Sequence, residues 1–333
     1  MALRGLNRKH YRALAVVAVL LTATVFLYDR YTPARSKWYL AYTKSSFDWK
    51  NRRQQHPVPA SSMAHPPSGQ PRLLRSVQHD FSRDGRDTEL EARQAERRNA
   101  VKNTFKKCWD SYREHAWGDD ELRPVALAGA NPYSGWGATL VDPLDTLWIM
   151  GLFDEFEQAA TAAAAIDWDI STSRSCSVFE TNIRYVGGLL SAYELSGDRR
   201  LLEKALELAD MLYAAFDTPN RMPVNSFYFN SAKRGDDLVP SAREVAASVG
   251  TLSLEFTKLT EFTGDIKFFD AIERIKLNLQ GSQDGTKLPG MWPTYIDLQN
   301  GFLTGDNSFT LGALADSLYE VSRVRGRADP SRS

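Results

Sequence analysis

The sequence is poor in the residues that hold most metal centres and disulfide frameworks. Its 333 residues include two cysteines, Cys108 and Cys176, and five histidines. It contains no CxxC, HExxH or paired-histidine spacing, so it gives no signal for a zinc site. Two cysteines cannot form a disulfide framework. One bridge between them stays open, but two unpaired, buried thiols are the favoured expectation.

The sequence also lacks a net charge and a phosphate-binding loop. It has 41 basic and 41 acidic side chains, so charge gives no reason to expect a nucleic-acid partner. No glycine-rich loop of the Walker or Rossmann form is present. With 333 residues, of which 43% are hydrophobic, the chain can form one large domain or two ordinary ones.

The first residues have the pattern of a membrane anchor. Residues 1–12 contain several Lys and Arg side chains, and residues 13–28 then run without a charge. Basic residues before an apolar run favour a cytoplasmic N-terminus. We therefore predict a cytoplasmic tail at 1–12 and a transmembrane signal-anchor helix at 13–28. The alternative is a cleaved signal peptide.

The next stretch changes in composition. Residues 29–90 include RRQQHPVPASSMAHPPSGQPR, which is rich in proline and polar residues and cannot bury a core. We predict a flexible, disordered stem that holds a lumenal domain away from the membrane.

Residues 91–323 are predicted to form an all-α domain of stacked helical hairpins. The sequences SGD at 196–198 and TGD at 263–265 each lie between two helical runs, which is a weak internal repeat. Strand signals are confined to 224–230 and 292–303. The predicted helices are 92–116, two helices within 140–166 that break near Phe153-Asp154, 199–216, 243–262, 266–280 and 309–323.

Residues 176–198 contain the strongest chemical signal. Glu180 and Arg184 lie four residues apart in an otherwise apolar helical run, so they share one face of the helix. Gly187-Gly188 lets a neighbouring backbone approach closely, and Gly197 is a helix stop. A carboxylate on a largely apolar helix is typical of a functional acid, although a structural ion pair is the commoner explanation.

Further acids occur on other predicted helices. Asp142 and Asp145 begin an apolar helix, where acids are usually caps or dipole partners. Asp316 and Glu320 are again four residues apart, and two carboxylates on one face repel unless something lies between them. Residues 117–124 form an exposed-looking acidic turn. Acids on several helices, with aromatic residues and few histidines, suggest glycoside hydrolysis, which needs two carboxyl groups around a sugar.

Several long motifs, in this order, resemble glycoside hydrolase family 47. They are TLVDPLDTLWIMGL, SVFETNIRYVGGLLSAYELSGD, GTLSLEFTKLTEFTGD and FTLGALADSLYE. WDSYREHAWGDDELRP and FDTPNRMPVN fit the same pattern, and the resemblance runs from about Arg97 to Val321. The family contains the class I α-1,2-mannosidases of the endoplasmic reticulum and Golgi. The resemblance implies an (α/α)7 barrel in a single-pass type II membrane protein with a lumenal catalytic domain.

The resemblance also implies the chemistry. The family removes α-1,2-linked mannose from high-mannose N-glycans of glycoproteins, with inversion and with bound calcium. Glu180 matches the acid of the FE[ST]xIR motif, the proton donor, and Arg184 the arginine that holds this acid and contacts sugar. Asp316 matches a second catalytic carboxylate, and Glu320 matches a glutamate that contacts the substrate.

Other positions match less closely or depart from the family pattern. Asp142 and Asp145 match acids of the first motif and are expected to contact substrate, although Pro143 replaces a small residue between them. Leu314 is expected in the substrate cleft and resembles the Golgi-type branch. Ser248 stands where the family commonly has a glutamate, which is expected to weaken substrate binding.

The family continues beyond the last matching motif, with another catalytic glutamate and a calcium-binding threonine. Residues 324–333 include RGRADPSRS, which resembles no part of the family. The sequence therefore predicts an incomplete barrel, roughly its first half, at 91–323, a non-family tail at 324–333 and no metal ligand in this chain. Two functions stay open: a calcium-dependent α-1,2-mannosidase, or a catalytically silent glycan-binding or quality-control protein.

Overall fold

The computed structural model describes residues 42–69, 79–80, 87–302 and 306–321. The chain divides into two units, Met1–Tyr42 and Thr43–Ser333. The predicted cytoplasmic tail, the signal anchor and the 324–333 tail all lie outside the described residues. Within the described residues, no helix is long and apolar enough to cross a membrane.

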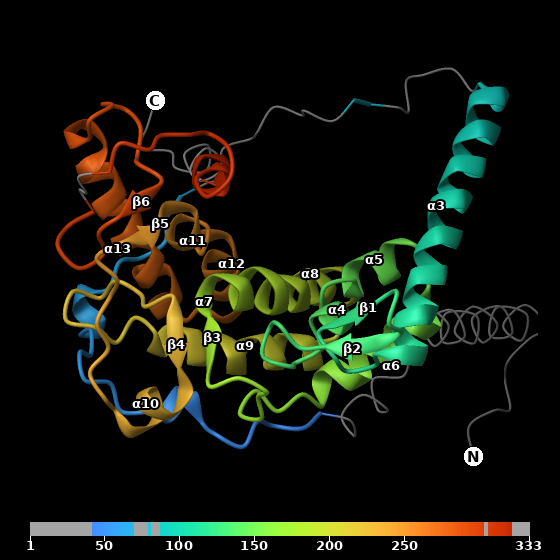
Figure 1. Cartoon of the computed structure of the whole chain (residues 1–333), viewed down its shortest axis with the longest axis horizontal. Coiled ribbons are helices and arrows are strands. Elements are labelled where there is room, and N and C mark those ends of the chain that lie inside the picture. Colours follow the sequence, from blue (N-terminus) through green and yellow to red (C-terminus); the bar gives the residue numbers. More distant parts are fainter. Residues whose placement is uncertain (1–41, 70–78, 81–86, 303–305, 322–333) are drawn as a thin grey trace, which may run out of the picture. The chain divides into compact units, whose positions relative to one another are not determined.

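Helices make up most of the second unit (Figure 1). The helices are α3 (Thr88–His115), α4 (Ala138–Val141), α5 (Leu144–Ile149), α6 (Phe153–Ala164), α7 (Val178–Glu180), the π-helix η4 (Thr181–Val186), α8 (Gly187–Ser196), α9 (Arg199–Ala214), α10 (Phe229–Arg234), α11 (Ala246–Gly250), α12 (Ser253–Thr263) and α13 (Ile266–Ser282). Short 3-10 turns are η1 (Trp49–Asn51), η2 (Ala60–Ser62) and η5 (Gln283–Gly285). Residues 316–321 are also helical.

Short strands pair into two-stranded antiparallel ribbons between the helices. The pairs are β1 (Glu121–Arg123) with β2 (Ala128–Ala130), β3 (Ser175–Ser177) with β4 (Ser226–Tyr228), and β5 (Glu244–Val245) with β6 (Tyr295–Ile296). Strands β4 and β6 fall where the sequence predicted strand signals, and the other four were not predicted. The prediction of a helical domain is confirmed, with ribbons at the ends of its helices.

Two helical hairpins repeat the same connection, as the sequence predicted. Gly197 follows α8 and Gly264 follows α12, and each has a left-handed backbone, with φ of 72° and 75°. This conformation ends a helix at little cost in glycine. Asp198 and Asp265 come next, and each side chain accepts the N–H two residues ahead. Such N-caps begin α9 and α13.

One predicted helix is wrong in its first half. The sequence predicted a helix over 309–323, but the described part of this stretch becomes helical only at 316. Leu314 has a φ of 71°, and a leucine in this left-handed region cannot lie within a right-handed helix. The Leu314 carbonyl instead accepts the N–H of Ala247, at 3.1 Å. At Leu314 the chain is therefore hydrogen-bonded to α11 and does not adopt the helical conformation that the sequence pattern favours.

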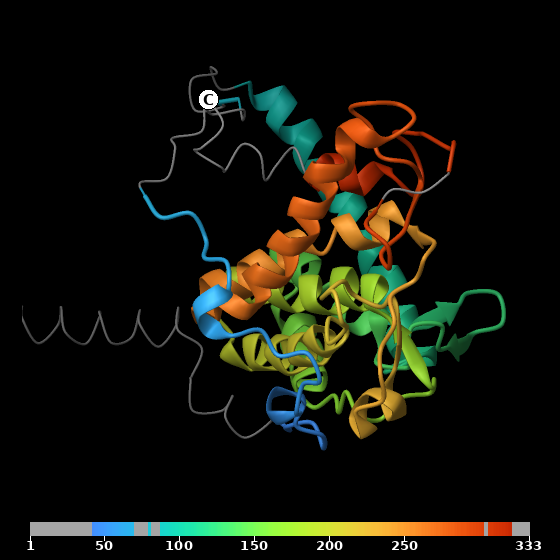
Figure 2. The ribbon, with the colours of Figure 1, turned by 90° about the vertical axis from the view of Figure 1, so that its left-hand side faces the viewer.

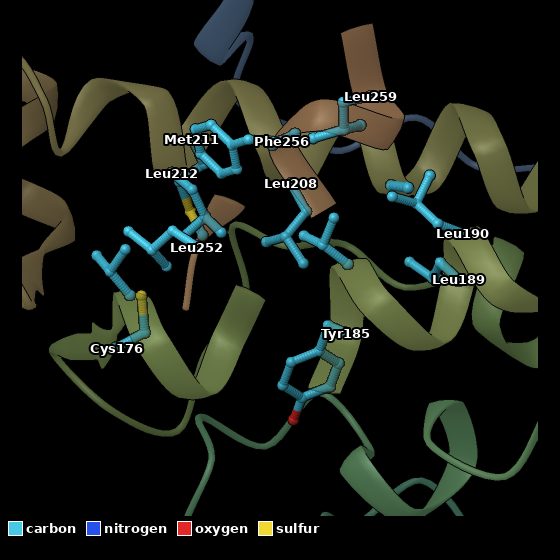
Figure 3. Close-up of a cluster of buried hydrophobic side chains, with 14 of the residues drawn as sticks. Cys176, Tyr185, Leu189, Leu190, Leu208, Met211, Leu212, Leu252, Phe256 and Leu259 are labelled. Atoms are coloured by element: carbon cyan, nitrogen blue, oxygen red, sulfur yellow. The ribbon is translucent and has the colours of Figure 1, made fainter. Parts of the chain in front are cut away.

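One part of the hydrophobic core lies between α8, α9 and α12 (Figure 3). Helix α9 buries most of its side chains, and its apolar side chains meet those of α8 and of the α11–α12 region. Side chains in this cluster include Leu189, Leu190, Leu208, Met211, Leu212, Leu252, Phe256 and Leu259. Burying each such side chain stabilises the fold by about 1.5–3 kcal/mol.

Gly188 lets two helices approach closely, as its sequence pattern predicted. A Cβ atom on Gly188 would lie 3.0 Å from the backbone oxygen of Val141 in α4. That separation is tighter than ordinary van der Waals contact, so a side chain here would push α4 away from α8. The approach keeps Asp142, the residue after α4, near the helix that carries Arg184.

The two cysteines are free thiols. Cys176 in β3 is buried, and burial raises the pKa of its thiol to about 12. Cys108 on α3 is exposed, so the prediction of two buried thiols is wrong for Cys108. Helix α3 buries only Trp109 and Tyr112, and Cys108 is not among its buried residues.

Residues 43–64, which we name the strap, are packed against the helical unit (Figures 1 and 2). Trp49 is 5% exposed, and its ring lies 5.5 Å from that of Phe227. The Ala64 N–H donates to Asp270 on α13 at 2.9 Å. The prediction of a flexible stem throughout 29–90 is therefore wrong for the strap, because its aromatic and polar groups have partners on the helical unit.

Asp217, just after α9, is the main polar anchor of the strap. Its side chain is 1% exposed and accepts hydrogen bonds from Arg52 Nη1 at 2.7 Å, from the Gln55 N–H at 2.9 Å and from the His56 N–H at 2.7 Å. Burial alone would raise the pKa of Asp217. The hydrogen bonds from these three groups outweigh burial and lower the pKa instead.

We expect Asp217→Ala to destabilise the protein by about 3–5 kcal/mol, because it leaves the buried Arg52 guanidinium without its partner. Urea unfolding of the full chain measures this loss. Limited proteolysis should also cut the strap faster in the variant. The control is Asp236→Ala, which removes an exposed pair with Arg234 and should change the unfolding midpoint little. Equal midpoints for both variants would mean that Asp217 does not anchor the strap.

Candidate functional site

Asp120 organises the loop beside the site. It is 1% exposed, and its carboxylate accepts four backbone N–H groups from residues 133–138 at 2.7–3.2 Å. The hydroxyl of Tyr185 in η4 donates to the same carboxylate at 2.9 Å. The predicted exposed acidic turn at 117–124 is therefore wrong for Asp120. The sequence could not reveal these partners because most of them are backbone groups.

Glu180 and Arg184 form the predicted pair. The Nε of Arg184 donates to Oε2 of Glu180 at 2.8 Å, and their side chains are 32% and 31% exposed. Ser177 caps α7 by accepting the N–H of Glu180 at 3.2 Å. The cap and the arginine together fix the start of the helix and the direction of the carboxylate.

Arg184 connects this pair to two further groups. Its Nη1 donates to Oδ2 of Asp142 at 3.3 Å, and its Nη2 to the hydroxyl of Tyr133 at 3.3 Å. The guanidinium carbon lies 4.3 Å from the centre of the Tyr133 ring, which is within cation–π range. We name Glu180, Arg184, Asp142 and Tyr133 the Glu180 cluster. A partly exposed cluster of this kind, with an aromatic face, can contact a bound sugar.

Burial raises the pKa of Asp142, and the nearby charges of Asp145 and Glu180 raise it further, while Arg184 acts in the opposite direction. Asp145 is not part of the cluster. It accepts a hydrogen bond at 2.8 Å from Ser191 on α8. The structure thus brings Asp142 to Glu180 and uses Asp145 to join α5 to α8.

Asp316, Glu320 and Leu314 lie on the 306–321 segment. Within the described residues, no hydrogen bond or ion pair joins Asp316 or Glu320 to the Glu180 cluster. The segment is held by other hydrogen bonds, among them one from Thr251 to the hydroxyl of Ser317 at 2.8 Å. Leu314 is 46% exposed. The functional roles expected for these three residues stay predictions.

Glu255 on α12 is a half-buried acid that the sequence analysis did not single out. Burial raises its pKa to about 7, and the hydrogen bond from Asn182 opposes this shift only in part. The Nδ2 of Asn182 donates to Oε2 of Glu255 at 2.7 Å. A signal was present, since Glu255 is a carboxylate in an apolar helical run, as Glu180 is.

No group of three or more His, Cys, Asp or Glu side chains among the described residues is arranged to hold a metal ion. The Glu180 cluster contains two carboxylates, and both already accept from Arg184.

Comparison with known proteins identifies the family of this region. Residues 104–323 match the family model of glycosyl hydrolase family 47. The mannosyl-oligosaccharide 1,2-alpha-mannosidase MNS1 of Arabidopsis thaliana is 40% identical over 229 residues, which cover 68% of this chain and 40% of that protein. The human endoplasmic reticulum mannosyl-oligosaccharide 1,2-alpha-mannosidase is 38% identical over 227 residues, covering 67% of this chain and 31% of that protein.

A solved structure shows the same fold. The alpha-1,2-mannosidase from Trichoderma reesei has a TM-score of 0.61 and 30% identity, and the match covers 68% of this chain and 49% of that one. The matched part of the chain therefore spans 31% to 49% of the length of these relatives. Glu180, Arg184 and Asp142 all lie within the matched residues.

The raised pKa of Glu255 predicts that stability falls as pH rises. A carboxyl whose pKa rises from 4.5 to about 7 on folding contributes stability that is present below pH 4.5 and lost as pH passes 7. The thermal midpoint should therefore fall between about pH 5 and about pH 8. The fall should be smaller in Glu255→Gln, which cannot titrate. Glu261→Gln, on the exposed part of α12, should follow the wild type, and identical pH profiles for all three proteins would refute this assignment.

Proposed function

Because the chain belongs to glycosyl hydrolase family 47, we propose that it is a mannosyl-oligosaccharide α-1,2-mannosidase. Its substrates would be high-mannose N-glycans of glycoproteins, from which it hydrolyses terminal α-1,2-linked mannose. The observation that carries the proposal is the Glu180 cluster, where an acid of the family motif is held by Arg184 at 2.8 Å and remains partly exposed.

The proposed chemistry assigns a role to each member of the cluster. Glu180 holds the proton for the leaving oxygen of the glycosidic bond, and Arg184 fixes its direction and contacts sugar. Inverting hydrolysis needs a second carboxyl about 6.5–9.5 Å from the first, with a water between them. Asp316 is proposed as a further catalytic carboxylate. Glu320, Asp142, Asp145 and Leu314 are proposed to contact the substrate.

The finer features of fold and location are also proposals. The helical hairpins are proposed to belong to an (α/α)7 barrel, which is supported by the likeness to the Trichoderma reesei enzyme. Location in the endoplasmic reticulum or Golgi is supported by the name of the human relative. A type II anchor at 13–28 rests on the apolar run and its basic flank.

Calcium is proposed as the cofactor on the family resemblance alone. The described residues offer no cluster of ligands for it, so no step of the chemistry above is assigned to the ion. Loss of activity in a chelator, with recovery on adding calcium, is the measurement that supports this assignment.

A second function, binding of glycans without hydrolysis, is favoured by one observation. Ser248 on α11 stands where the family commonly has a glutamate, and it is half-buried. A serine hydroxyl can accept from a sugar, but it cannot provide the charge of a carboxylate. The two functions differ in whether bound glycan is cleaved.

We expect the full chain to release mannose from a Man9 N-glycan in the presence of calcium. Glu180→Gln keeps the shape of the side chain but cannot donate its proton, and it should lower kcat by about 10²–10⁴-fold. The matched control is Glu194→Gln on α8, an exposed glutamate that pairs with Lys258, which should remain as active as the wild type.

The outcomes separate the two functions. Glycan binding without mannose release, from a chain whose circular dichroism shows it to be folded, supports the silent glycan-binding protein. A folded chain that neither binds nor cleaves the glycan contradicts both. Equal activity in Glu180→Gln and in the control would remove Glu180 from its proposed role.

A further inference from the structure

The helix that carries Glu180 and Arg184 contains a π-turn. In η4 (Thr181–Val186), the N–H of Gly187 reaches the carbonyl oxygen of Asn182, five residues earlier. Turns of this kind are rare in helices and frequently occur at functional sites. Glu180 immediately precedes η4 and Arg184 lies within it, so the winding of this turn sets how the two side chains are directed.

Glu255 hydrogen-bonds one of the two residues that close the π-turn and lies beside the other. Its Oε2 accepts from Asn182 Nδ2 at 2.7 Å. Its Oε1 lies 3.4 Å from the place where a Cβ of Gly187 would be. The carboxyl group of α12 thus lies against the turn at the two residues joined by its characteristic hydrogen bond.

Burying the Asn182 side chain next to Glu255 costs free energy. Asn182 is 0% exposed, and its Oδ1 has no hydrogen-bond partner among the described residues. Within the same part of the chain, no cation forms an ion pair with Glu255. Burying such polar groups without full compensation costs free energy. The hydrogen bond between Nδ2 and Glu255 is therefore the polar contact that fixes the Asn182 side chain.

We propose that Glu255 is a positioning residue that holds the π-turn of η4 through Asn182 and so fixes the directions of Glu180 and Arg184. Glu255 does not touch the substrate in this role. Without the carboxyl group of Glu255, Asn182 loses the partner that favours the five-residue hydrogen bond of η4. Rewinding η4 as an ordinary α-helix would then rotate Arg184 relative to Glu180.

The structural test is hydrogen exchange in the full chain. Glu255→Ala should speed exchange of the Gly187 amide by about tenfold or more, because the π-turn opens more often. Exchange at Gly197, which ends α8, should be unchanged. Glu255→Gln retains an oxygen that can accept from Asn182 and should stay near the wild type. Glu261→Ala, on the same helix, is the matched control.

The kinetic test rests on the proposed function. Glu255→Ala should lower kcat for mannose release by about tenfold with KM little changed, and Glu255→Gln should restore most of it. A purely structural role would instead lower the unfolding midpoint while leaving kcat per folded molecule unchanged. If Glu255→Ala does not fold, Glu255→Asp, whose shorter side chain withdraws from Asn182, takes its place in both tests.

Unchanged exchange at Gly187 in the folded variant would overturn the inference, as would equal effects in Glu261→Ala. If the wild type releases no mannose, the proposed function fails, and hydrogen exchange alone then decides whether Glu255 holds the turn.

Discussion

The Glu180 cluster depends on one buried carboxylate, that of Asp120. Among the residues that the structure describes, no cation forms an ion pair with it, and backbone N–H groups of 133–138 together with the Tyr185 hydroxyl donate to it instead. These hydrogen bonds join the loop that carries Tyr133 to the helix that carries Arg184. The guanidinium can therefore lie over the Tyr133 ring while it holds Glu180. Loss of this carboxylate would free the loop and remove one wall of the site.

The sequence predicted the features that depend on near neighbours. The glycine ends of α8 and α12 and the Asp198 and Asp265 caps follow from preferences of single residues. The Glu180–Arg184 pair follows from its four-residue spacing. The strap could not be predicted in this way. Its anchor, Asp217, is more than 160 residues from Arg52, Gln55 and His56, and composition alone favoured disorder.

Contacts between residues far apart in sequence also explain the wrong helix prediction at 309–323 and the failure to single out Glu255. The helical pattern of 309–323 is present in the sequence, but the backbone of Leu314 is left-handed where its carbonyl accepts from Ala247. Tertiary packing therefore overrides local preference there. Glu255 was missed for a related reason. Its significance lies in Asn182, 73 residues away, and in a π-turn that has no sequence signature.

The charges of the site favour a neutral ligand rich in hydroxyl groups. Glu180 and Asp142 share a single arginine, so an anionic ligand would meet two carboxylates and one cation. Burial is the main cause of the raised pKa of Asp142, and the charges of Asp145 and Glu180 raise it further, against the effect of Arg184. A sugar carries no charge, and its hydroxyls can donate to both carboxylates. The charges of the cluster therefore suit an uncharged, hydroxyl-rich ligand, as the proposed function requires.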